Sequence, residues 1–334
     1  MQTSKKDYMI PDRLPRQFTD RLRSREALLL LLLIIVVCVN SGLSPYFLDV
    51  YNLADSTQNF SEKAIIVLSM TLVIIGREID ISVASIIALS GVMMGFAAAN
   101  GLDTWAIVAT GLATGTLAGA VNGLLVTKLE LPSIIVTIGT MSLYRGIAFI
   151  ILGDKAYTDF PKSFEAIGQT YFFSDLVPAQ FLTFILLAAV AWYFLHHTVF
   201  GRRLYAIGNN PVTARYSGIK VNNYRLALLT LNGFMSAMAA VFLVSRISTA
   251  RPNMAGSWEL EVITIAILGG VSIFGGSGKI PGVILAVFLI GMVQFGMQLI
   301  NIPGIIMSIF TGVLLVASLV LPILFGKFFT QKGC

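Results

Sequence analysis

Amide and hydroxyl side chains inside apolar stretches are the residues of this chain whose types could do chemistry. They are Asn122, Thr140, Asn232, Gln294, Gln298 and Asn301. An unpaired amide is costly in lipid, so such a group must face protein or a wet cavity. Two interpretations stay open. The groups form hydrogen bonds between helices, or they line a path along which an uncharged, hydroxyl-rich solute crosses.

One basic side chain, Arg145, also lies within an apolar stretch, and Glu259 and Glu261 lie at the start of another. An isolated charge near the membrane interior is expensive, and pairing reduces the cost. We therefore predict an ion pair between Arg145 and one of these two carboxylates. Its role would be structural rather than substrate binding.

The spacing of the remaining reactive residues excludes several sites. A nucleotide-binding loop, G-x-x-x-x-G-K-[ST], would need glycine at 273 and serine or threonine at 280, where Ile273 and Ile280 stand. Segment 275–282 is therefore predicted to be a tight turn that does not bind ATP. His196 and His197 have no neighbouring cysteine or carboxylate to complete a metal site. We expect a non-catalytic chain with no metal and no cofactor of its own.

The composition indicates a protein embedded in the lipid bilayer. Of its 334 residues, 56% are hydrophobic and 12% are charged, whereas soluble domains carry about 25% charged residues. The net charge of +6 falls in short segments between apolar stretches, so it does not indicate nucleic-acid binding. Cys38 and Cys334 are not expected to form a disulfide, because one lies in an apolar stretch and the other ends the chain.

Hydropathy predicts an all-α membrane protein with about ten spans, since a span needs about 20 apolar residues. The second could instead be a re-entrant segment, and the ten could divide into two inverted repeats of five. The predicted spans are 27–44, 63–76, 82–99, 104–126, 131–152, 179–196, 224–244, 259–275, 280–300 and 303–325.

The distribution of lysine and arginine predicts the orientation. Basic residues gather in alternate connecting segments, which places both chain ends in the cytoplasm by the positive-inside rule. The chain then divides into a cytoplasmic tail (1–26), a transmembrane domain (27–325) and a second cytoplasmic tail (326–334). The connection 153–178, rich in aromatic residues, would lie outside and could form a short surface helix.

The most basic internal connection is the loop 197–223, which holds Arg202, Arg203, Arg215 and Lys220. Asn210 followed by Pro211 is typical of a helix start. A cytoplasmic helix between two spans suggests a docking site for a soluble partner. Elsewhere, glycines recur every four residues over 111–123, which favours close packing of that helix against a neighbour.

Five blocks, in order, resemble the permeases of bacterial ABC sugar importers of the ribose, xylose, rhamnose and autoinducer-2 type. They are 77–86, 131–146, 200–219, 245–282 and 291–304. The family usually shows Gly-Gly-Ile-Asp-Leu-Ser-Val-Gly in the first block. Here Arg77, Glu78 and Ala84 stand where glycine is expected, which indicates a subgroup.

The resemblance implies a ten-helix permease of the inner membrane that works with a second permease copy or a paralogue. A cytoplasmic ABC ATPase would bind ATP and magnesium, and a periplasmic protein would deliver the sugar. By this resemblance the loop that couples to the ATPase includes Gly201, Arg202, Arg203, Tyr205, Gly208, Asn209, Asn210, Ala214, Arg215, Ser217 and Gly218.

The amino-acid sequence of the second block, 131–146, is most similar to that of rhamnose permeases, so L-rhamnose or a related sugar is the predicted substrate. Autoinducer-2, ribose and xylose stay open as alternatives. Outside this class, an ion-coupled secondary transporter is the competing interpretation.

Overall fold

The computed structural model describes residues 25–173 and 176–330. Helices make up nearly all of its regular structure, in agreement with the predicted all-α class, and one short antiparallel pair joins β1 (Tyr171–Phe172) to β2 (Val177–Pro178). The predicted tail 1–26 lies largely outside the described residues, as do residues 331–334 of the predicted tail 326–334, whereas residues 326–330 continue the last helix.

The long helices follow the predicted order of the apolar segments, with three short helices between them. The long ones are α2 (Arg25–Leu43), α3 (Val50–Ile75), α4 (Val83–Ala99), α5 (Thr104–Lys128), α6 (Ser133–Leu152), α8 (Ala179–His197), α11 (Val221–Ile247), α13 (Ile280–Leu299) and α14 (Gly304–Thr330). The apolar segment 259–275 forms only the shorter α12 (Trp258–Leu268). The short helices are α7 (Lys162–Gln169), α9 (Val199–Asn209) and α10 (Pro211–Tyr216).

Each predicted span falls on one helix, but the helices differ in their ability to cross a bilayer. Across the described part of the chain, 7 helices are long and apolar enough: α2, α3, α5, α6, α8, α11 and α13. Helix α12 has 11 residues and is therefore about 16 Å long, roughly half of the hydrocarbon core. Ten complete spans and a repeat of five stay predictions.

Helix α3 corrects the interpretation of the second span. It begins at Val50 rather than near residue 63, and it is among the most buried helices. Asp49 starts it, because its Oδ1 accepts from the backbone N–H of Asn52 at 3.0 Å. The first half was assigned to a loop because it carries polar residues such as Gln58 and Glu62, which the fold buries.

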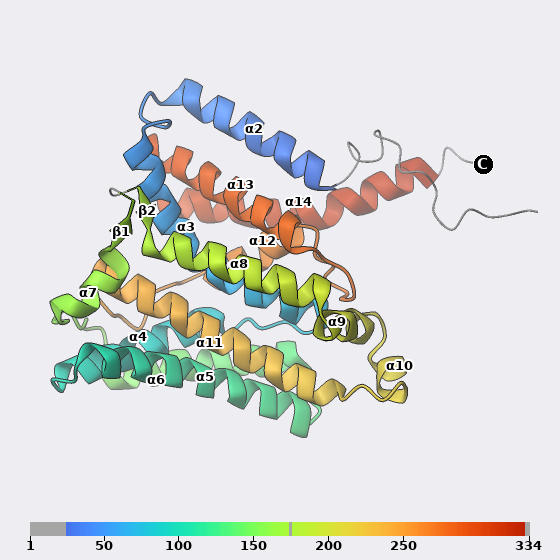
Figure 1. Ribbon diagram of the computed structural model, residues 1–334, viewed down its shortest axis with the longest axis horizontal. Helices are drawn as coiled ribbons and strands as arrows, with labels where there is room; N and C mark the ends of the chain where they lie inside the picture. Colours follow the sequence, from blue (N-terminus) through green and yellow to red (C-terminus); the bar gives the residue numbers. More distant parts are fainter. Residues whose placement is uncertain (1–24, 174–175, 331–334) are drawn as a thin grey trace, which may run out of the picture.

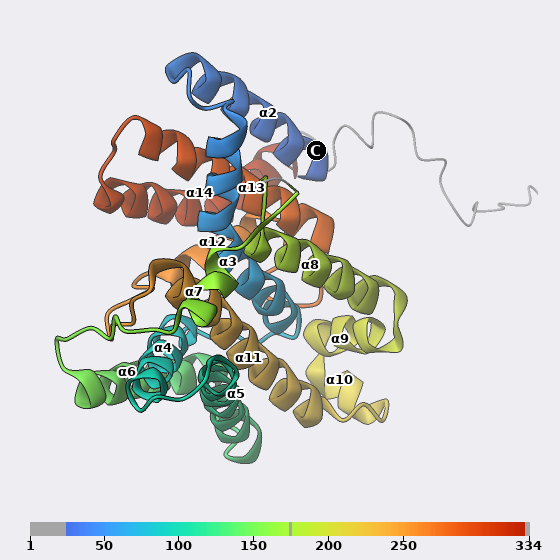
Figure 2. The same cartoon turned by 60° about the vertical axis from the view of Figure 1, so that its left-hand side comes forward.

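Figure 1 shows most long helices running side by side, with α7, β1 and β2 at one end and α9 and α10 at the other. Helix α3 passes between one group formed by α2, α13 and α14 and another formed by α4, α5, α6 and α11 (Figure 2). We call the end that carries α9 and α10 the basic end. The charge pattern predicts that it faces the cytoplasm.

The glycine series in α5 packs against α11, as predicted. A Cβ added to Gly115 would lie 2.7 Å from the carbonyl oxygen of Gly233, and one added to Gly119 would lie 2.5 Å from that of Leu229. These glycines therefore let the two helix backbones approach closely. The contact fixes α11, the helix that follows α10, to the body of the molecule.

Candidate functional site

The basic loop 197–223 folds into α9 and α10, which lie beyond the end of α8 (Figure 1). Helix α10 begins as predicted: Asn210 Oδ1 accepts from the backbone N–H groups of Val212 and Thr213, both at 3.1 Å, and Pro211 is the first helical residue. Helix α9 was missed, although Leu204 and Ile207 are buried while Arg202 and Arg203 are exposed. This periodicity was the available signal.

Two glycines allow α9 to pack against its neighbours. A Cβ on Gly201 would overlap the carbonyl oxygen of Leu195 in α8, and one on Gly208 would overlap that of Ile75, the last residue of α3. The same Ile75 oxygen accepts from the backbone N–H of Gly276 at 2.9 Å. Helix α9 is thus packed directly on the end of the central helix.

Polar bonds join α9 to the turn that contains residues 275–278. Tyr205 Oη donates to the carbonyl oxygen of Gly278 at 2.7 Å, and Asn209 Nδ2 donates to that of Gly276 at 3.4 Å. Burial raises the pKa of Tyr205, so the phenol keeps its proton for this bond. Gly275 and Gly276 have φ of 82° and 72°, as expected for the predicted tight turn.

Helix α10 is short and is held by one apolar contact and by polar bonds. Ala214 is buried against Ile207 and Val221. Ser217 Oγ donates to the Thr213 carbonyl oxygen at 3.0 Å, and Gly218 ends the segment at φ 82°. Arg215 donates to Asn222 Oδ1 at 3.3 Å and stays exposed.

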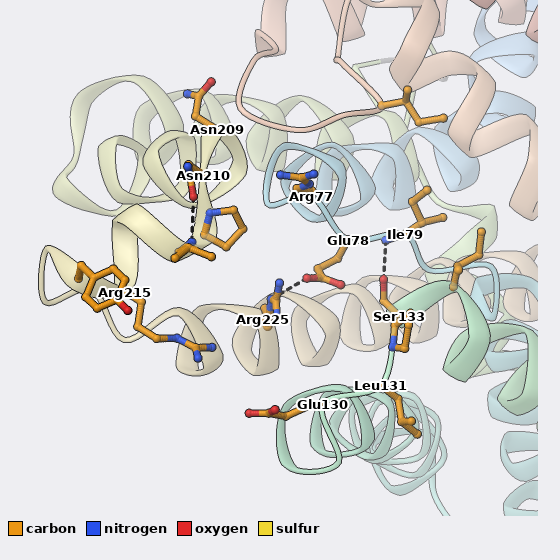
Figure 3. A pocket seen from close by; sticks show the side chains of 16 residues that line it. Arg77, Glu78, Ile79, Glu130, Leu131, Ser133, Asn209, Asn210, Arg215 and Arg225 are labelled. Atoms are coloured by element: carbon orange, nitrogen blue, oxygen red, sulfur yellow. Dashed lines mark hydrogen bonds and ion pairs between the residues drawn. The ribbon is translucent and has the colours of Figure 1, made fainter.

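A cavity of about 800 Å³ lies between the α9–α10 junction and the loops 76–82 and 129–132. Figure 3 shows Asn209, Asn210 and Arg215 on one side of this cavity and Ser133 on the other. Glu78 lies between them and forms an ion pair with Arg225 of α11, with 2.6 Å between Oε1 and Nε. Burial raises the pKa of Glu78, and the Arg225 charge opposes this effect.

The surface beside this cavity is both basic and apolar. Val212, Tyr216 and Phe274 are 63%, 90% and 81% exposed, and Arg202 and Arg203 are also exposed. Aromatic residues with arginine are typical of the centre of protein–protein interfaces. This end of the molecule therefore has the composition of a docking surface for another protein.

Two of the candidate pathway amides lie in a buried polar network instead. Asn232 Nδ2 donates to Asp80 Oδ2 at 2.9 Å, and Asn122 Nδ2 donates to Ser82 Oγ at 2.8 Å. Ser82 Oγ in turn donates to Asp80 Oδ1 at 2.6 Å. All four side chains are fully buried, so in this conformation Asn122 and Asn232 bind helices together rather than face a path. Thr140 is also buried, and it donates to the Thr137 carbonyl oxygen at 3.4 Å.

The other three candidate pathway residues lie at or just after the C-terminal end of α13, away from the basic end. Gln294 and Gln298 line a second cavity of about 320 Å³ between α3, α12, α13 and α14. Asn301 lies exposed beyond α13 with φ 57°. The structure therefore brings Gln294 and Gln298 together at one cavity and separates them from Asn122 and Asn232.

The predicted ion pair of Arg145 with either Glu259 or Glu261 is not among the ion pairs of the described residues. Arg145 Nη1 donates to the carbonyl oxygens of Pro252 and Met254 at 2.8 and 2.9 Å, while Glu261 pairs with Lys63 of α3 at 2.7 Å. Segment 248–257 lies between these charges and offers its own carbonyl groups.

A second buried ion pair, between Glu62 and Arg246, was also missed. It joins α3 to the end of α11 at 2.7 Å between Oε1 and Nε. Both missed pairs, Lys63–Glu261 and Glu62–Arg246, start from the part of α3 around residue 62. No local pattern points to these pairs, because residues 45–62 fall between the predicted spans 27–44 and 63–76 and are therefore predicted to connect them.

Comparison with known proteins gives consistent matches along the chain. The family model described as "Branched-chain amino acid transport system / permease component" matches residues 52–319. The ribose import permease protein RbsC of Bacillus subtilis is 33% identical over 86% of this chain and 89% of its own. The autoinducer 2 import system permease protein LsrD of Klebsiella pneumoniae is 35% identical over 87% of this chain and 89% of its own. No solved structure matches.

Proposed function

The chain belongs to the family of transport-system permease components whose model covers residues 52–319, and from this premise we propose that it is the membrane subunit of an ATP-driven importer. It is a multi-pass protein that provides the path, and a separate cytoplasmic ABC ATPase provides the energy. The observation that carries the proposal is the exposed apolar and basic surface of α9 and α10, packed on the end of central α3.

The proposed substrate is a monosaccharide or a similar small polyhydroxylated solute. Relatives named for ribose and for autoinducer 2 import support this class, because the chain covers more than four fifths of each. L-Rhamnose stays a candidate only because the sequence of segment 131–146 resembles that of rhamnose permeases. The family description names branched-chain amino acids, so L-leucine is the control substrate.

In the proposed cycle, a loaded periplasmic binding protein docks at the end that carries α7 and segment 248–257. ATP then closes the ATPase pair at the basic end, and α9 passes this movement to α3 and to the turn around Gly276. Coupling requires that α9 and α10 bind the closed pair and the open pair with different free energies. A second permease copy or a paralogue would complete the path in the inner membrane.

One observation favours an ion-coupled transporter as the second candidate. Asp80 is fully buried and accepts from Ser82 and Asn232 rather than from a basic side chain. A buried acidic residue in a membrane protein is a common site for ion coupling.

Uptake into proteoliposomes distinguishes the ATP-driven importer from the ion-coupled transporter. The purified chain is reconstituted with its ATPase and binding protein, and radiolabelled D-ribose, D-xylose, L-rhamnose, autoinducer-2 and L-leucine are offered in turn. We expect uptake of a polyhydroxylated solute that requires ATP and survives an ionophore. Uptake that needs an ion gradient and no ATP, or uptake of L-leucine alone, would contradict the proposal.

A further inference from the structure

The second cavity lies at the end opposite α9 and α10. Helix α13 starts beside the turn that Tyr205 binds, so Gln294 and Gln298, near the last turns of α13, lie far from the basic end. Helix α14 begins at this opposite end, and its first turns contribute Ser308 and Thr311 to the lining. The volume of about 320 Å³ is that of a small-molecule pocket.

Three polar side chains of this cavity, Lys63, Glu261 and Gln294, form one connected set without net charge. Lys63 Nζ lies 2.7 Å from Glu261 Oε1 and 3.3 Å from Gln294 Oε1, and Gln294 Nε2 donates to Glu261 Oε1 at 2.7 Å. The side chains of Lys63 and Glu261 are 14% and 12% exposed. A paired ammonium and carboxylate give both donors and acceptors while their charges cancel, which suits neutral hydroxyl groups better than an ion.

An aromatic ring forms part of the same wall. Trp258 lines the cavity, and Lys63 Nζ lies 5.3 Å from its ring centroid, within reach of a cation–π contact. A tryptophan offers a flat apolar face with a polar edge. The C–H face of a sugar ring fits the flat apolar face of Trp258, while the sugar hydroxyl groups would reach Glu261 and Gln294.

The backbone before Trp258 is held in an uncommon conformation. Ala255 and Ser257 have φ of 56° and 69°, a region that costs free energy for residues other than glycine. Arg145 fixes this segment by its bonds to Pro252 and Met254. Strain of this kind gathers at binding sites, and here it sets the start of α12 and the place of the Trp258 ring.

From the ring, the neutral polar set and the cavity between them, we infer that this cavity is a contact site for a neutral monosaccharide. The solute would stack on Trp258 and bond to Lys63, Glu261 and Gln294 as it leaves the binding protein. This inference rests on the proposed importer function and names the residues that meet the solute first.

The test uses the complete importer in proteoliposomes and the sugar that the native chain imports from D-ribose, D-xylose and L-rhamnose. Two variants, Trp258→Ala and Trp258→Phe, are compared with Trp105→Ala, an exposed ring on α5 outside the cavity. Uptake is measured against sugar concentration, and ATP hydrolysis is measured with the unloaded binding protein. The second readout depends on coupling and not on the sugar.

We expect Trp258→Ala to reduce sugar uptake about tenfold or more, the scale of a lost binding contact, while ATP hydrolysis stays native. Trp258→Phe should restore most uptake, and Trp105→Ala should be native. Native uptake by Trp258→Ala overturns the inference alone. Failure of the native chain to import any of the three sugars overturns the inference. Failure to import autoinducer-2 as well, or to stimulate ATP hydrolysis, overturns the proposed function.

Labelling of a cysteine in the cavity keeps the inference testable if Trp258→Ala does not fold. Ser308→Cys, in a chain with Cys38→Ser and Cys334→Ser, is labelled with N-ethylmaleimide in the assembled importer, and labelling in the presence of L-leucine is the control. We expect the imported sugar to slow labelling of Ser308→Cys and L-leucine to leave it unchanged. Equal labelling with and without the sugar contradicts a sugar site here.

Discussion

Asp80 shows how one buried carboxyl group can hold a membrane protein together. It accepts from Ser82 and from Asn232 of α11, and Ser82 in turn accepts from Asn122 of α5. A buried polar group that loses its hydrogen-bond partner costs free energy. These hydrogen bonds therefore fix the loop between α3 and α4 to helices α5 and α11.

Removal of the Asp80 carboxylate should destabilise the fold. Asp80→Ala leaves the Asn232 amide and the Ser82 N–H buried without an acceptor, at a cost of about 1–3 kcal/mol for each group. We expect a lower melting temperature of the detergent-solubilised chain, followed by tryptophan fluorescence. Asp159→Ala, an exposed carboxylate, is the control. Equal melting temperatures for the two variants would show that the network does not stabilise the fold.

Gly208 should tolerate no side chain. The methyl group of Gly208→Ala would overlap the Ile75 carbonyl oxygen, and backbone cannot move aside as a flexible side chain can. We expect α9 to shift and sugar uptake to fall severely. Gly139→Ala on α6 is the matched control, because an added Cβ there meets nothing within 4 Å. Equal uptake by both variants would contradict the packing of α9 on α3.

Helix α9 is the element that we propose passes movement from the ATPase to α3 and to the turn around Gly276. Tyr205→Phe removes one hydrogen bond to Gly278, worth about 1 kcal/mol, and keeps the ring in place. We expect less sugar transported per ATP hydrolysed, with a melting temperature lowered by about 4 °C at most. Tyr193→Phe removes an exposed hydroxyl on α8, outside the docking surface, and should leave this ratio unchanged. A native ratio in Tyr205→Phe would show that the bond carries no coupling.

The elements that the sequence predicted well have local signals. The start of α10 at Asn210 and Pro211 and the packing of Gly115 and Gly119 depend on neighbours in sequence or on one helix face. The length of α3 was wrong because Gln58 and Glu62 are polar yet buried. The partners of Arg145 and Glu261 were missed because pairing depends on tertiary distance, which a single sequence does not encode.

The molecule places the proposed docking surface and the proposed sugar site at opposite ends. The basic end presents Tyr216, Phe274 and exposed arginines to a partner protein, and the opposite end holds the cavity around Trp258. Helices α3 and α13 contribute to both ends. A change of α9 can therefore reach the cavity through continuous helices rather than through flexible loops.

Co-purification of the ATPase shows whether the surface of α9 and α10 binds it. An affinity-tagged chain with Phe274→Asp and Tyr216→Asp is compared with Phe173→Asp, which replaces one exposed ring at the opposite end by a carboxylate. We expect the first variant to fold yet to lose the co-expressed ATPase and ATP-driven uptake, while Phe173→Asp retains the ATPase. Equal recovery of the ATPase with both variants would contradict docking at α9 and α10.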